Sequence, residues 1–578
     1  MSLLVVLLPS ALVLLIAYRL YGSLLARLFQ LDPNAVTPAV TLRDDIDYAP
    51  IPPELLLGQH FSAIAAAGPI VGPILAGVAF GWLPALLWIL IGSIFIGGVH
   101  DFAALVASVR HKARSIAEVV RDHMSRRSYL LFLAFVWIAL VYIIVAFTDI
   151  TASSFIGRQV LENGQTVSGG GIATSSLLYL ALPIIMGLCM RYAKMPLWLA
   201  TVIFLPLVGL TIWVGQFMPF DLGQWLGTSD AIAQKIWAVL LLAYCLVAAM
   251  VPMWLLLQPR GHLGGCFLYV ALAGAAIGLI VSDRMVAGDS AIRYPAFTSW
   301  QAGKTGSLIP MLFITIACGA CSGFHSLIAS GTTSKQLRKE TDAKAIGYGA
   351  MLLEAFVAVV SLACVMVLAG DSKLASQPPN FIYALGMGRF LEILGVPAMI
   401  GVSFALMAFT TFVYDTLDVC TRLGRYIVQE LTGLTGKAGG WLGTALTTGV
   451  PLVFLLRPHV DAQGNTVPVW RTFWSLFGAS NQLLAALTLL GVTVWLWRTR
   501  REAWVWLVTG VPTVFMYVMS TWALASMTLP RFRNANGFVL PADPVPWAGL
   551  VLLSLAAAML VEAILVIATP QRPLSVPE

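Results

Sequence analysis

Long apolar runs recur along the whole chain, and this feature limits the possible folds more than any other. A run of about 18–25 apolar residues crosses the hydrocarbon core of a bilayer as one α-helix. Charged residues are 11 % and hydrophobic residues 59 % of the 578 residues, whereas a soluble domain carries about 25 % charged residues. The sequence therefore predicts an all-α polytopic membrane protein embedded in a lipid bilayer. We expect fifteen spans: 2–21, 58–80, 81–109, 128–156, 174–190, 196–216, 231–257, 263–282, 307–330, 345–369, 389–420, 438–456, 473–497, 502–528 and 546–568.

Composition and missing motifs exclude several classes of protein. The net charge of +7 fits basic cytoplasmic loops, so a nucleic-acid partner is not expected. The sequence has no nucleotide-binding Gly-x-x-x-x-Gly-Lys-Ser/Thr motif, so an ATP-driven pump would need another subunit. It also lacks a nucleophile elbow and a zinc-protease helix, so we expect neither an enzyme nor a bound cofactor.

The loop charges predict the orientation. Short cytoplasmic loops carry the excess of Lys and Arg, and every second loop here is basic. The basic set includes residues 110–127, 335–344, 422–425 and 498–501. These loops lie on one side of the predicted membrane, which places the N-terminus outside and the C-terminus in the cytoplasm.

Two spans carry residues that interrupt a helix. In the first, Gly68-Pro69 and Gly72-Pro73 each combine a flexible residue with one that has lost its backbone donor. In the second, residues 318–326 contain small and polar residues, among them Gly319, Ser322, Gly323 and His325, where Leu and Ile are expected. Broken backbone within a membrane is tolerated where protein or a water-filled cavity satisfies it, so we expect both breaks to face a cavity. Close helix packing on glycine is the alternative.

The breaks occupy matching positions in two halves of opposite orientation. Five spans at 58–216 begin on the cytoplasmic side, two follow at 231–282, and five at 307–497 begin outside. Paired broken helices in inverted halves are typical of secondary transporters, with the substrate between the repeats. One extra helix at 1–22 and two at 502–568 complete the predicted organisation.

Ionisable residues inside predicted spans are candidates for ion coupling, because each is costly at membrane depth. His100 and Asp101 are adjacent and fall near mid-depth, while Glu354 has weaker context. Asp415 is predicted to serve coupling or gating, and Asp418 to pair with Arg422, four residues later.

Long strings of residues in this chain resemble one known family, the carbon starvation proteins, CstA. The strings are 58–73 (GQHFSAIAAAGPIVGP), 97–101 (GGVHD), 322–333 (SGFHSLIASGTT), 346–354 (IGYGAMLLE), 415–426 (DTLDVCTRLGRY) and 474–487 (WSLFGASNQLLAAL). The resemblance implies a bacterial inner-membrane carrier, induced when carbon is scarce, that imports peptides or pyruvate. It also implies membership of the amino acid, polyamine and organocation transporters, with a leucine-transporter-like core of five plus five inverted helices and two broken helices.

The predicted mechanism is alternating access around the two breaks. The half-helix N-termini at the breaks suit a substrate carboxylate, a group that pyruvate and short peptides share. The residues that we expect to bind the substrate are Gly68, Pro69, Gly72, Gly319, Ser322, Gly323 and His325. We expect protons to drive uptake through His100 and Asp101, with Asp415 as the alternative relay. One alternative is coupling to sodium, held by Thr410 or Thr411 together with carbonyls of the first break. Another is an ion-conducting channel. A metal at His60, His100 or the Cys318/Cys321 pair is a weaker hypothesis.

Overall fold

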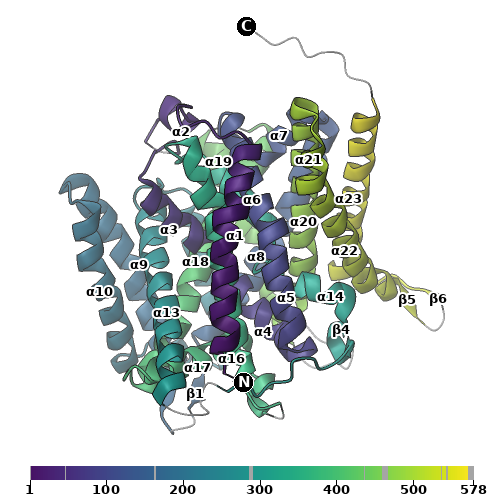
Figure 1. Ribbon diagram of the computed structural model, residues 1–578. Helices are drawn as coiled ribbons and strands as arrows, with labels where there is room; N and C mark the ends of the chain where they lie inside the picture. Colours follow the sequence, from purple (N-terminus) through teal and green to yellow (C-terminus); the bar gives the residue numbers. More distant parts are fainter. Residues whose placement is uncertain are drawn as a thin grey trace.

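The computed structural model describes residues 2–569, except 46, 162–163, 286–290, 371, 435, 459–466, 535–536 and 542–543. This part of the chain forms a bundle of helices that run up and down between two ends (Figure 1). Thirteen of its helices are long and apolar enough to cross a membrane, and the bent pair α3–α4 adds a fourteenth. The chain is a multi-pass membrane protein.

The helices of the bundle follow in chain order. They are α1 (Leu4–Leu28), α3 (Pro53–Ile64), α4 (Gly68–Phe80), α5 (Trp82–Gly92), the π-helix η1 (Ser93–Gly97), α6 (Gly98–Arg110), α8 (Arg126–Ser154), α9 (Gly169–Tyr192), α10 (Leu197–Phe217), α12 (Asp230–Ala248), α13 (Leu257–Met285), α14 (Leu308–Thr315), α15 (Gly323–Ile328), the π-helices η3 (Ala329–Thr333) and η5 (Lys344–Gly349), α16 (Ala350–Met366), α17 (Pro379–Glu392), α18 (Ala398–Thr432), α19 (Lys437–Leu456), α20 (Val469–Arg500), α22 (Val511–Thr528) and α23 (Pro544–Ala568).

Short elements connect these helices. They are α2 (Pro38–Thr41), α7 (Ile116–His123), α11 (Leu222–Leu226), α21 (Ala503–Val505), the π-helix η7 (Trp506–Gly510), the 3₁₀ turns at 303–305, 340–342, 373–376 and 529–532, and three two-stranded antiparallel hairpins, β1–β2 (Arg158–Val160, Thr166–Ser168), β3–β4 (Gln301–Ala302, Gly306–Ser307) and β5–β6 (Arg533–Asn534, Gly537–Phe538).

The predicted spans match this list, with corrections. Fourteen of the fifteen predicted spans correspond to the thirteen long helices and the bent pair α3–α4. The fifteenth, predicted at 307–330, is divided into the short helices α14 and α15. The predicted span 389–420 has the wrong limits, because α17 ends at Glu392 and α18 begins at Ala398. Gly395, with φ of 84°, and Pro397 separate them. Arg260 also lies inside α13 rather than in a loop between two spans.

Burial separates a central set of helices from a peripheral one. The most apolar stretch of α20 is completely buried within the protein. The corresponding stretch of α23 is 22 % buried, so most of its side chains lie on the surface of the bundle. Helices α8 and α18 pack against each other, and α8 also packs against α20. These long central helices form the frame that positions the breaks.

The two ends of the bundle differ in charge, as the loop pattern predicts. The N-terminus lies at the end that carries the β1–β2 hairpin (Figure 1). Helices α2 and α7 lie at the opposite end, where the basic loop after α6 also falls. We call this second end the α7 end; which side of the membrane it faces stays a prediction.

Candidate functional site

The first break lies one turn before the predicted one. Helix α3 ends at Ile64 and α4 begins at Gly68, with a bend of 44° between them. Pro69 lies in the first turn of α4, where a missing backbone donor costs nothing because that N–H has no acceptor within the helix. Pro73 lies inside α4. The three residues 65–67, all alanine, therefore form the break, and the Gly-Pro pair starts the second half-helix.

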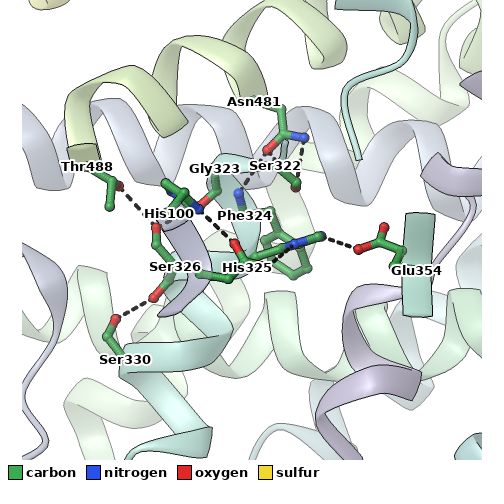
Figure 2. Close-up of polar contacts among 11 residues, drawn as sticks. His100, Ser322, Gly323, Phe324, His325, Ser326, Ser330, Glu354, Asn481 and Thr488 are labelled. Carbon is green, nitrogen blue, oxygen red and sulfur yellow. Dashed lines mark hydrogen bonds and ion pairs between the residues drawn. The ribbon is translucent and has the colours of Figure 1, made fainter. Parts of the chain in front are cut away.

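The second break spans residues 316–322, between α14 and α15. Asn481 of α20 closes it: its side-chain oxygen accepts from the backbone N–H of Phe324, at 2.8 Å, and its amide lies 3.0 Å from the Ser322 hydroxyl (Figure 2). The N-terminus of α15 thus already has an acceptor from the protein. Asn481 was not among the predicted site residues, although its string was one of those that resembled the family.

Two glycines at the start of α4, directly after the first break, pack against the second break and the end of α14. A Cβ atom at Gly68 would lie 2.3 Å from Cys318 Sγ, and one at Gly72 would lie 2.5 Å from the Thr315 carbonyl oxygen. A Cβ atom at Gly323 would likewise lie 2.4 Å from the carbonyl oxygen of Asn481 in α20. Such contacts are possible only for glycine. The glycines therefore set the packing of the breaks, and their proposed contact with substrate stays a prediction.

A buried cluster of acids and histidines joins three helical segments beside the second break. His100 Nδ1 lies 2.7 Å from Asp101 Oδ1, and His325 Nδ1 lies 2.8 Å from Asp101 Oδ2. His325 Nε2 faces Glu354 Oε2 of α16 at 3.2 Å, close but outside hydrogen-bond geometry (Figure 2). All four side chains are fully buried. We call this set the acid–histidine cluster.

The donor pattern of this cluster leaves a place for one more proton. If each histidine donates from Nδ1 to Asp101, its Nε2 carries a lone pair while the ring is neutral. The Nε2 of His325 then faces a carboxylate at 3.2 Å, so this contact is attractive only when one of the two groups carries a proton. Among the described residues, neither Asp101 nor Glu354 pairs with an arginine or lysine. The charge of the cluster therefore depends on protons alone.

A second buried cluster is built around Arg260, which the sequence analysis missed. Its Nε lies 2.5 Å from Asp415 Oδ1 and its Nη1 lies 2.7 Å from Asp418 Oδ2. The hydroxyl of Tyr244 donates to Asp418 Oδ2 at 2.9 Å, and Ser62 of α3 donates to Asp415. We call this set the arginine cluster. It ties α13 to α18 and to the first broken helix.

One sequence feature indicates that the chain near Arg260 packs closely against another helix. Gly261, Gly264 and Gly265 follow it and bring α13 against α3; a Cβ atom at Gly265 would lie 2.5 Å from the carbonyl oxygen of Gly58. The predicted ion pair between Asp418 and Arg422 is wrong. Arg422 instead donates to the carbonyl oxygens of residues 248 and 251, at 3.0 and 2.5 Å, because the end of α12 lies within its reach.

Thr410 and His60 form their hydrogen bonds outside these two clusters, although His60 lines a small cavity together with Asp415. The Thr410 hydroxyl lies 3.2 Å from Ser176 of α9, whereas Thr416 donates to the carbonyl oxygen of Ala63 near the first break, at 3.0 Å. Thr411 is buried in α18. His60 Nδ1 lies 2.8 Å from the Thr333 hydroxyl. Within the described ranges, no group of three His, Cys, Asp or Glu residues is arranged to hold a metal ion.

Two cavities open toward opposite ends of the bundle. The cavity at the α7 end has a volume of about 390 Å³, and the cavity beside β1 and β2 has about 160 Å³. Helix α18 lines the cavity at the α7 end with Leu423 and the cavity beside β1 and β2 with Leu406. Asp415 and Asp418 lie between these two positions on the same helix. The arginine cluster is therefore part of the layer that separates the cavities.

Comparisons with known proteins identify the family. The model of "Carbon starvation protein CstA" matches residues 2–380 and 369–523. The peptide transporter CstA of Campylobacter jejuni is 33 % identical, covering 89 % of this chain and 79 % of its own. The pyruvate/proton symporter BtsT of Escherichia coli is 30 % identical, covering 92 % and 83 %. The peptide transporter CstA of Bacillus subtilis is 31 % identical, covering 90 % of each.

A solved structure shares the fold. The manganese transporter of Eremococcus coleocola superposes with a TM-score of 0.50 at 16 % identity, covering 91 % of this chain and 98 % of its own. This likeness supports the leucine-transporter-like fold and says nothing of the substrate. The match of the family model over most of the sequence, together with relatives at 30–33 % identity, shows that the chain belongs to the carbon starvation protein CstA family.

Proposed function

We propose that this protein is a secondary active transporter that imports small carboxylate nutrients, pyruvate or short peptides, by alternating access coupled to protons. The acid–histidine cluster is the observation that carries the proposal. Relatives named as peptide transporters and as a pyruvate/proton symporter support the two substrates and the coupling. The protein then lies in a bacterial inner membrane, with the α7 end in the cytoplasm and the N-terminus outside, because the basic loops gather at the α7 end.

Proton binding can be coupled to movement because the acid–histidine cluster joins separate segments. Asp101 and His100 belong to α6, His325 to α15 after the second break, and Glu354 to α16. Loss of the proton shared by His325 and Glu354 leaves a buried carboxylate without a donor, which is costly away from water. Opening toward one of the cavities relieves that cost by admitting water. The protonated cluster favours the closed arrangement.

Sodium coupling at the first break is less favourable on electrostatic grounds. The alternative placed Na⁺ between the end of α3 and a threonine of α18. The guanidinium of Arg260 already supplies a cation there, since it contacts Asp415 while Ser62 of α3 donates to the same carboxylate. The positive charge of this guanidinium would repel a second cation bound nearby. A proton is therefore the better candidate for the coupling ion.

The helix contacts favour a modified division into repeats. The prediction placed the two additional helices at 231–282. If α9 and α10 are the additional helices, the two halves make equivalent contacts: α3 packs on α13 as α15 packs on α20, and α8 packs on α12 as α18 packs on α19. Helix α9 packs most extensively on α10, as expected for a separate pair. We propose repeats of 53–110, 126–154 and 230–281 against 308–366, 398–456 and 469–500.

Uptake by proteoliposomes tests the proposed function. Purified protein is reconstituted, and labelled pyruvate and a labelled dipeptide are supplied with an acidic outside, with no pH gradient, and with a sodium gradient. Saturable uptake that follows the pH gradient, together with counterflow, supports a proton-coupled carrier. Uptake that follows sodium and ignores pH contradicts the assignment to the acid–histidine cluster. Flux that neither saturates nor exchanges identifies a channel.

A further inference from the structure

An apolar groove of about 430 Å³ lies on the surface of the bundle between α1, α3 and the η5–α16 segment. We call it the α1 groove. Its walls are almost entirely apolar side chains, and some, such as Leu15, are more than half exposed to the surroundings of the protein. The lining residues are Ala11, Leu14, Leu15, Tyr18, Leu57, Ala345, Gly349, Leu352, Leu353 and Phe356. In a membrane-spanning bundle such a surface faces lipid.

The length of the groove matches one leaflet of a bilayer. Along α1 it runs from Ala11 to Tyr18, and along η5 and α16 from Ala345 to Phe356. At 1.5 Å per residue these stretches are about 10 and about 16 Å long. One leaflet contributes about 15 Å of the hydrocarbon core. The groove therefore accommodates an acyl chain that enters at the α7 end and stops near mid-membrane.

A cation stands at the mouth of the groove without an acidic partner. Lys344 Nζ lies 4.7 Å from the ring centroid of Tyr18, which lines the groove, and donates to the Ser23 hydroxyl at 2.8 Å. Its electrostatic neighbour is a second cation, the exposed Arg19 of α1. Among the described residues, Lys344 forms no ion pair with a carboxylate. Two positive charges near a membrane surface attract an anionic headgroup.

We propose that the α1 groove binds one anionic phospholipid, with an acyl chain along the groove and the phosphate between Lys344 and Arg19. The phosphate offsets the repulsion between the two cations and supplies the anionic partner that Lys344 lacks. The acyl chain covers apolar surface that three helices leave open. The site is distinct from both buried clusters, and its test does not depend on the proposed transport function.

Native mass spectrometry of the purified full-length protein tests the site. The protein is titrated with phosphatidylglycerol or with phosphatidylcholine of identical acyl chains. We expect one phosphatidylglycerol to bind with a preference of about fivefold over phosphatidylcholine, as expected for a basic residue near an anionic headgroup. Lys344→Gln should reduce the preference, since only Arg19 then faces the phosphate, whereas Lys437→Gln, an exposed lysine on α19 away from the groove, should keep it. Equal binding of the two lipids, or a preference unchanged in Lys344→Gln, would overturn the proposal.

Two further arms separate headgroup from acyl chain. Glycerol 3-phosphate, which carries the charge without the chain, should not displace the lipid at equal concentration; displacement would show a phosphate site rather than a lipid site. Ala11→Phe, which fills the mid-membrane end of the groove, should weaken both lipids. If this variant does not fold, the Lys344→Gln comparison still decides.

Discussion

The two buried clusters hold similar carboxylates but differ in the cation that faces them. In the arginine cluster, Asp415 and Asp418 share Arg260, whose charge is permanent under all physiological conditions. In the acid–histidine cluster, Asp101 and Glu354 face only histidine rings, whose charge can change. A fixed cation makes a fixed tie between helices, whereas a titratable partner makes a tie that a proton controls. The first cluster therefore suits structure and the second suits coupling.

The largest expected effect is on the fixed tie. Arg260→Met leaves two buried carboxylates without a cation, and the loss of one partner from a buried ion pair costs about 3–5 kcal/mol. We expect a strong loss of folded protein and a much lower Tm by fluorescence-detected size-exclusion chromatography. Arg260→Lys, which keeps the charge but loses the fork geometry, should fall between. A variant that is as stable as the parent would show that Arg260 is not a structural tie.

The next effect concerns the acceptor shared by the two histidines. Asp101→Asn keeps the size of the side chain but removes its charge, so the protein should fold and enter the membrane. Accumulation driven by a pH gradient should fall by more than about tenfold, because an amide has one acceptor oxygen and cannot hold both histidines as Nδ1 donors, the arrangement that leaves His325 Nε2 facing Glu354. Exchange of labelled for unlabelled substrate should survive, since it needs no net proton movement.

A control separates this result from simple damage. Thr410→Val removes a buried hydroxyl from the spanning helix α18 and should leave pH-driven accumulation nearly unchanged. If Asp101→Asn accumulates substrate normally, or if Thr410→Val abolishes the response to a sodium gradient, the coupling site lies elsewhere.

A smaller effect is expected at the far end of the same cluster. Glu354→Gln keeps a hydrogen-bonding side chain opposite His325 and changes only the second carboxylate. We expect uptake to persist and its pH profile to shift, with a reduction of about two- to tenfold in accumulation. An unchanged pH profile would limit the coupling site to Asp101 and its two histidines.

Sequence patterns predicted helices and breaks well because these depend on local properties. The apolar length of each span and the Gly-Pro pair near Gly68 are local signals. The partners of buried charges are not local: His325 meets Asp101 across 224 positions, and Arg260 meets Asp415 across 155. Sequence spacing predicted an ion pair of Asp418 with Arg422, whereas in the structure Asp418 pairs with Arg260 of another helix. The break also shifted to residues 65–67, because a proline in a first turn starts a helix as readily as it ends one.

The smallest expected effect, on the acid stability of the fold, comes from a contact between two histidines outside the membrane spans. No carboxylate of the described residues lies between their rings. His111 Nε2 lies 2.9 Å from His123 Nε2 of α7, and His111 Nδ1 lies 2.6 Å from the Ala107 carbonyl oxygen. Burial, and then His111, lower the pKa of His123 to about 4; Asp122 opposes this shift and Arg498 adds to it. Helix α7 is thus held to the core by a histidine that is neutral when folded.

The sign of the pH effect follows from that shift. A histidine with a pKa near 4 in the folded state and about 6.5 when unfolded favours unfolding as it takes up a proton. Its contribution is complete above about pH 6.5 and is lost as the pH falls toward 4. We expect the Tm of the parent to decrease by a few degrees from pH 7 to pH 5, and that of His123→Gln to decrease less. An equal decrease in both would assign the acid sensitivity to the buried clusters, where protons are proposed to act in transport.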